Sequence, residues 1–158
     1  MAIVTSTVTV NAAFLQEIKE DNRELAQLLT KAEAECQSAT NSPSSAATID
    51  HRLVQVRDQL AFHFALEEAY GYFENAVDAA PRLCGQATAL RAQHEALFVE
   101  ICEIADEAEE MRLSRNGRRR VRTVANRFLN FCHRLRQHEA DETELILQAL
   151  DDDIGVGD

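Results

Sequence analysis

Apolar residues recur along most of this chain at alternating steps of three and four, the spacing of one face of an amphipathic α-helix. The clearest series lies in the C-terminal part of the chain and consists of Val121, Val124, Phe128, Phe131, Leu135, Leu145 and Ala149. Continuing the same spacing through the gap in this series places His138 and Glu142 on the apolar face. Carboxylates are rarely buried unless they are paired or bind a metal ion, so these two residues indicate a specific role.

The same spacing predicts four helices. The first runs from a cap at Asn11 to about Cys36, and the second begins at Thr48 or Asp50 and runs to about Asp78. The third extends from Pro81 to about Leu113, and the fourth follows the turn at residues 114–117 and ends near Leu150. The polar segment 37–48 is the one clear linker. Because short connections join antiparallel neighbours, we predict an all-α protein, an antiparallel up-down four-helix bundle over residues 12–150.

Both ends of the chain are expected to lie outside the bundle. Residues 1–11 are rich in Val and Thr, which predicts a short extended N-terminal arm. Residues 151–158 begin with three Asp residues, whose charge would oppose the dipole of a helix C-terminus, so we expect an acidic C-terminal tail there. The length of 158 residues suits one domain with a sizeable core.

Charge and composition narrow the classes of function. The formal net charge of −11 argues against binding to nucleic acid or to an anionic membrane surface. The one basic cluster, residues 115–122, is expected to be a solvated loop and first helical turn, with contact to an anion as the alternative. There is no signal-peptide pattern and no apolar run of roughly 20 residues, so the expected location is the cytoplasm. Without a CxxC pair, the cysteines are expected to be reduced and mostly buried.

Polar residues interrupt the apolar face of every predicted helix. They are Asn22 on the first, His63 and Glu67 on the second, His94 on the third, and His138 and Glu142 on the fourth. Each lies near the middle of its helix, so antiparallel packing should bring them to one level. Three imidazoles and two carboxylates at one depth would be a costly core without a cation, and a purely polar network is the alternative. Mixed imidazole and carboxylate ligands suit iron, manganese or zinc.

The pattern resembles the hemerythrin-like (HHE) domain over residues 12–150. The residues that carry the resemblance lie in the segments EDNRELAQLL, HFALEE, QHEALF and HEADETELI, with His-x-x-x-Glu on the second and fourth helices. Ferritin-like di-iron proteins are the competing class, but they use Glu-x-x-His, and no such pair occurs in the matching helices. The resemblance implies a non-haem di-iron centre bridged by Glu67 and Glu142 and capped by His63, His94 and His138.

Two positions depart from the family pattern. Asn22 stands where the first helix normally supplies a histidine, and Phe98 stands where oxygen-carrying members have a second histidine on the third helix. Each change removes a ligand, so the resemblance implies a centre that is more water-ligated or only partly filled. This weakens the expectation of reversible oxygen transport.

Three functions follow from the resemblance. The first is a metal-binding protein that binds or senses a small ligand (O₂, NO or peroxide) or iron, holding two iron ions at full or partial occupancy, with manganese or zinc as alternatives. The second is a di-iron enzyme that consumes peroxide, O₂ or NO. The third is a metal-poor family member that acts as an interaction module. None of the three calls for a nucleic-acid or membrane partner, and the sequence indicates no particular protein partner.

Overall fold

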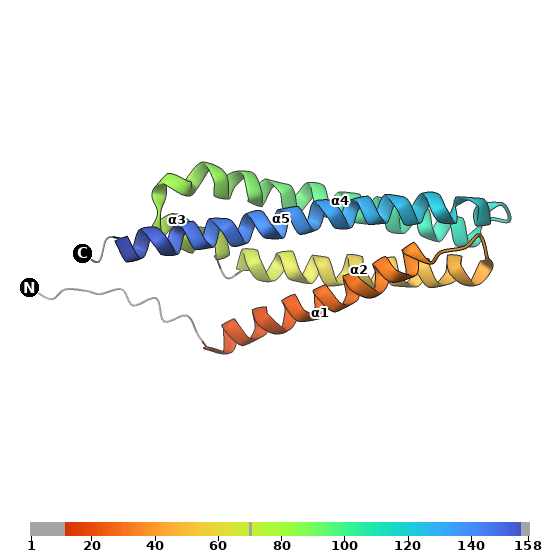
Figure 1. Cartoon of the computed structure of the whole chain (residues 1–158), viewed down its shortest axis with the longest axis horizontal. Coiled ribbons are helices and arrows are strands. Elements are labelled where there is room, and N and C mark those ends of the chain that lie inside the picture. The colour runs from red at the N-terminus through yellow and green to blue at the C-terminus, as the bar shows by residue number, and fades with distance from the viewer. Residues whose placement is uncertain (1–11, 70, 156–158) are drawn as a thin grey trace, which may run out of the picture.

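The computed structural model describes residues 12–69 and 71–155, with side chains described for residues 20–69, 71 and 73–152. The elements are α1 (Ala12–Gln37), α2 (Pro43–Ala69), α3 (Tyr72–Ala79), η1 (Pro81–Leu83), α4 (Cys84–Leu113), η2 (Gly117–Arg120) and α5 (Val121–Gly155). The long helices α1, α2, α4 and α5 lie side by side and alternate in direction (Figure 1). Within these residues there is no strand, so the prediction of an all-α up-down bundle is confirmed. The predicted N-terminal arm lies outside the described residues.

The second helix begins earlier than predicted. It starts at Pro43, where proline loses no intrahelical hydrogen bond, and the loop shrinks to residues 38–42. Ser42 caps it, because its hydroxyl accepts a hydrogen bond from the backbone N–H of Ser45 at 3.2 Å. The small residues that suggested a linker therefore continue the helix once this cap is in place.

The second helix also ends earlier than predicted. Gly71 has a φ of 65°, a left-handed conformation that favours glycine, and it separates α2 from the short helix α3. After this break α3 packs against α4 and α5. The prediction of one helix running to Asp78 is therefore wrong.

The last helix continues beyond the predicted end at Leu150 and reaches Gly155. Asp152 is neutralised by Arg82, which donates hydrogen bonds of 2.6 and 2.9 Å to the two carboxylate oxygens. A guanidinium on the neighbouring chain segment thus offsets part of the unfavourable interaction between the acidic residues and the helix dipole. The expected tail at residues 151–158 is wrong for its first five residues, since α5 includes them.

The buried apolar side chains that the structure describes form two clusters. The larger cluster occupies the half of the bundle near the α4–α5 turn and contains Leu53, Ile101 and Phe128. The smaller cluster lies around α3 and includes Phe73 and Leu145. Between them along the helices lies a layer of buried polar residues, which interrupts the apolar packing of the bundle.

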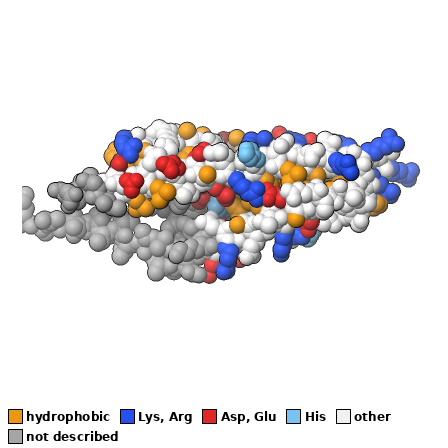
Figure 2. Space-filling model, viewed as in Figure 1, with side chains coloured by type: hydrophobic (Ala, Val, Ile, Leu, Met, Phe, Trp, Pro, Cys, Tyr) orange, Lys and Arg blue, Asp and Glu red, His pale blue; other side chains and the backbone are white. Residues whose placement is uncertain are grey.

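The surface carries charge of both signs, and positive side chains gather at the end of the molecule where the α4–α5 turn lies (Figure 2). The arginines of this turn are exposed, as the sequence predicted; they are Arg115, Arg118, Arg119, Arg120 and Arg122. Among the described helices, none is both long enough and apolar enough to cross a membrane.

Candidate metal centre

The five residues predicted as metal ligands come together in the polar layer. His63 and Glu67 project from α2, His94 from α4, and His138 and Glu142 from α5. All five are buried, with exposed fractions between 2% for His138 and 6% for Glu67. Spacing by four residues puts each histidine one turn before its glutamate, so both side chains of a pair point to the same face of the helix.

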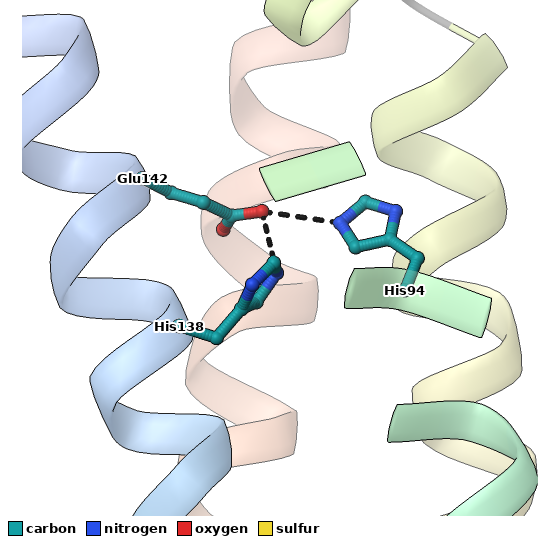
Figure 3. Close-up of side chains that lie close together, drawn as sticks. All are labelled: His94, His138 and Glu142. Carbon is teal, nitrogen blue, oxygen red and sulfur yellow. Dashed lines mark hydrogen bonds and ion pairs between the residues drawn. The ribbon is translucent and has the colours of Figure 1, made fainter. Parts of the chain in front are cut away.

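Each pair on one helix makes a short contact. His63 Nε2 lies 2.8 Å from Glu67 Oε1, and His138 Nε2 lies 2.8 Å from Glu142 Oε1. His94 Nε2 lies between the pairs, 3.2 Å from Glu67 Oε2 and 3.2 Å from Glu142 Oε1. Figure 3 shows His94 and His138 pointing toward the carboxylate of Glu142. One imidazole therefore connects the carboxylates of two different helices.

The donor atoms form two overlapping groups suited to metal binding. One group is His63, Glu67 and Glu142, and the other is His94, His138 and Glu142. Within each group the donor atoms lie within 4.8 Å of one another. Glu142 belongs to both groups, as a carboxylate that bridges two ions must.

Unsatisfied polar atoms support this interpretation. Buried polar atoms in folded proteins nearly always form hydrogen bonds. Here His63 Nε2, Glu67 Oε2 and His138 Nε2 are buried and form no hydrogen bond. All three belong to the cluster of donor atoms, and a cation is the partner that imidazole nitrogens and carboxylate oxygens share. The residues present therefore fit a metal ion.

The electrostatics of the layer favour positive charge. Burial alone would lower the pKa of His63, but the carboxylates of Asp21 and Glu67 raise it to about 10. Burial likewise opposes charge on His94, whose pKa is nevertheless raised to about 9 by Glu142 and Glu67. Burial alone would raise the pKa of Glu67, but His63 and His94 lower it to about 2. The Glu67 carboxylate thus remains ionised and attracts a cation, either a proton on an imidazole or a metal ion.

The model of the hemerythrin HHE cation-binding domain matches residues 13–150 of the chain. The chain belongs to the hemerythrin HHE family. The match extends from α1 through nearly all of α5, so the whole bundle is the family's domain. The resemblance read from the sequence is confirmed. No curated protein and no solved structure is significantly similar to this chain.

The first helix differs from the expectation. Asn22 is exposed, so its predicted position on the core face is wrong. The buried residue is its neighbour Asp21, whose exposed fraction is 4%. Asp21 Oδ2 lies 2.6 Å from His63 Nδ1, and Asp21 Oδ1 accepts a hydrogen bond of 2.8 Å from Gln59 Nε2. In this chain α1 therefore places a carboxylate next to Nδ1 of His63.

A signal for Asp21 was present in the sequence. The buried residues of α1 with described side chains are Asp21, Leu25, Leu29, Ala32 and Cys36, at steps of four, four, three and four. Both position 21 and position 22 lie one turn before Leu25, and the choice between them depends on the exact rotation of α1 in the bundle. On chemical grounds Asp21 is the better candidate for the inward position, because its carboxylate can accept a hydrogen bond from a histidine on the apolar face of a neighbouring helix.

Phe98 on α4 stands where the sequence comparison with oxygen-carrying members expected a second histidine. It is half-buried and lies at a surface cleft of about 280 Å³ between α2 and α4. The cleft is lined mainly by apolar side chains and reaches His94. The ring of Phe64 stacks on the imidazole of His94, with centroids 4.2 Å apart and planes inclined by 15°. Glu68, also at the cleft, has a carboxylate oxygen 3.6 Å from His94 Nδ1. The position that lacks a histidine thus borders an opening to the surface.

Proposed function

We propose that this hemerythrin HHE protein holds two metal ions, iron in the first instance, and that it uses them to bind or sense a small ligand such as O₂, NO or peroxide, or to bind iron itself. The observation that carries the proposal is the sharing of Glu142 by two buried donor groups. A single carboxylate between two sets of imidazole and carboxylate donors is the arrangement that a bridged pair of ions requires.

One ion would be held by His63, Glu67 and Glu142, and the other by His94, His138 and Glu142. Glu67 supports a second bridge, because its Oε2 atom lies 3.2 Å from His94 Nε2 of the other group. When bound, iron supplies open coordination positions and a change of oxidation state, which protein side chains lack. The surrounding apolar side chains limit the access of water, and manganese or zinc would suit the same donors.

An enzyme is the second candidate, and the cleft beside His94 is compatible with it. The cleft between α2 and α4 gives small molecules a route toward His94 past Phe98. An oxygen carrier, a sensor and an enzyme all need such a route, so the cleft is compatible with each of them. Consumption of peroxide, O₂ or NO by the iron-loaded protein would favour the enzyme.

Metal analysis tests the proposed function. Protein purified from iron-supplemented cells is expected to contain about two iron ions per chain, as for other two-metal sites. Removal of the metal with a chelator should lower the melting temperature, because a ligand that binds only the folded state stabilises it. A protein that takes up no metal and melts at the same temperature in chelator would instead be a metal-poor interaction module.

A further inference from the structure

We infer that Asp21, held in place by Gln59, is a positioning residue that directs Nε2 of His63 toward the metal. The inference rests on the proposed metal site and concerns a residue outside both donor groups. In this chain the first helix would then contribute through His63 rather than through a ligand of its own.

The geometry fixes the Asp21 carboxylate at both of its oxygens. Oδ2 lies 2.6 Å from His63 Nδ1, and Oδ1 accepts the hydrogen bond from Gln59 Nε2 at 2.8 Å. Gln59 precedes His63 by one turn of α2, so a single side chain of α1 contacts two successive turns of the neighbouring helix. Asp21 is 4% exposed and His63 is 3% exposed, so water competes little for these contacts.

These contacts determine which nitrogen of His63 is available to a metal. A carboxylate accepts hydrogen bonds, so His63 Nδ1 carries the proton and donates it to Asp21. In the neutral imidazole, the form that binds a metal ion, the lone pair is then left on Nε2, the nitrogen that lies 2.8 Å from Glu67 Oε1. A carboxylate behind a ligating imidazole fixes the ring orientation and increases the basicity of the metal-binding nitrogen. Asp21 lies at Nδ1, away from the donor atoms, and so adds negative charge without taking a coordination position.

The other two histidines have weaker partners at the corresponding atom. His138 Nδ1 lies 2.9 Å from the amide oxygen of Gln93, which is neutral. His94 Nδ1 forms no hydrogen bond, and its nearest carboxylate, that of Glu68, is 3.6 Å away. Of the three ligating histidines, His63 alone has a carboxylate at hydrogen-bond distance from Nδ1. Loss of Asp21 should therefore weaken the ion held by His63 and spare the ion held by His94 and His138.

The test uses Zn²⁺ as the probe ion in the full chain. The dissociation constants of both ions are measured by competition with a chelator for the wild type, Asp21→Ala, Asp21→Asn and the matched control Asn22→Ala. Asp21→Ala is expected to weaken one ion by about 10- to 100-fold, the usual effect of losing a carboxylate behind a ligating histidine, and to leave the other within about threefold. Asp21→Asn, which keeps an acceptor but loses the charge, should fall between Asp21→Ala and the wild type. Asn22→Ala should match the wild type.

A second measurement separates positioning from a purely structural role. The ¹H–¹⁵N spectrum of the zinc-loaded protein is expected to show a strongly downfield Nδ1–H signal for His63, caused by the short hydrogen bond to a carboxylate. This signal should disappear in Asp21→Ala and persist in Asn22→Ala. If Asp21→Ala does not fold, Gln59→Leu replaces it and should produce a smaller loss of the same ion.

The outcomes distinguish this inference from the proposed function. A wild-type protein that binds no Zn²⁺ overturns both. Two ions in the wild type, together with unchanged affinities and an unchanged His63 signal in Asp21→Ala, overturn the inference alone. Equal weakening of both ions with the His63 signal retained would also overturn it, because Asp21 would then act only on the stability of the bundle.

Discussion

His94 Nε2 on α4 lies 3.2 Å from Glu142 Oε1 on α5, so the two helices meet through a polar contact inside an otherwise apolar bundle. The same nitrogen lies 3.2 Å from Glu67 Oε2 on α2. Neither glutamate is near His94 in the sequence, and the contact exists only because three helices pack with their polar residues at one level. Substitution of Glu142, which contacts both His94 and His138, therefore tests the polar layer most directly.

Glu142→Ala is expected to abolish binding of both metal ions, because Glu142 belongs to both donor groups. It also removes the carboxylate next to His94 and His138, which should lower the free energy of unfolding by about 3 kcal/mol, as for other broken buried pairs. Elemental analysis and chemical denaturation measure the two effects.

The matched control for that variant is Glu144→Ala, which removes an exposed glutamate from the same helix. It should keep its metal and change stability by less than about 0.5 kcal/mol, as for ordinary surface substitutions. Full metal occupancy in Glu142→Ala would show that Glu142 does not bridge the ions.

Asn22→His is expected to leave the metal content unchanged. The first-helix histidine of the family suggests that this substitution would restore a ligand, but the Asn22 side chain is exposed and the inward position belongs to Asp21. A histidine at position 22 would therefore remain in solvent. An increase in bound iron, measured by elemental analysis against the wild type, would show that α1 is rotated relative to the structure described here.

The thiols should differ sharply in reactivity toward iodoacetamide. Cys84 is exposed, whereas Cys36 and Cys132 are buried, with exposed fractions of 6% and 1%. Burial raises the pKa of Cys36 to about 12 and also raises the pKa of Cys132. The thiolate is the reactive form and increases with pH, so at pH 8 both buried residues remain protonated and should stay unlabelled.

Peptide mass spectrometry checks this prediction, with the protein unfolded in guanidinium as the control in which both buried cysteines react. Raising the pH from 8 to 9 should not label Cys36, because its pKa remains well above that range. Labelling of Cys132 in the native protein as rapid as that of Cys84 would contradict the packing of α5.

Gly117→Ala is expected to destabilise the protein by about 2 kcal/mol, within the range for strained core substitutions. A Cβ atom at this position would lie only 1.9 Å from the backbone oxygen of Met111, so the α4–α5 turn would have to open. Thermal and chemical unfolding measure the loss.

Gly85→Ala is the control for this glycine. Apart from its chain neighbours and the adjacent backbone of α4, no atom lies within 4 Å of a Cβ at Gly85, so alanine should stabilise the helix by about 0.5 kcal/mol. Equal effects of the two substitutions would mean that the turn tolerates a side chain.

Much of the fold was available from the sequence, because burial in a bundle requires a regular apolar face. The apolar face of α5 predicted the helix and the inward positions of His138 and Glu142, and the structure contains both. The errors lie where local rules compete with tertiary contacts. The acidic end of α5 remains helical next to Arg82, a residue far away in sequence. Gly71 ends α2 with a left-handed φ of 65°, which the apolar spacing does not predict.

The sequence by itself determined that the histidine and glutamate pairs of α2 and α5 point inward, since a spacing of four residues fixes the relative direction of two side chains on one helix. Only the tertiary structure decided how these groups meet. It placed His94 between the glutamates of α2 and α5, and it turned α1 so that Asp21 rather than Asn22 reaches His63. The rotation of a helix about its axis depends on how its whole surface packs against its neighbours. Positions 21 and 22 lie four and three residues before Leu25, and both spacings fit the apolar face, so the sequence does not decide which of the two points inward.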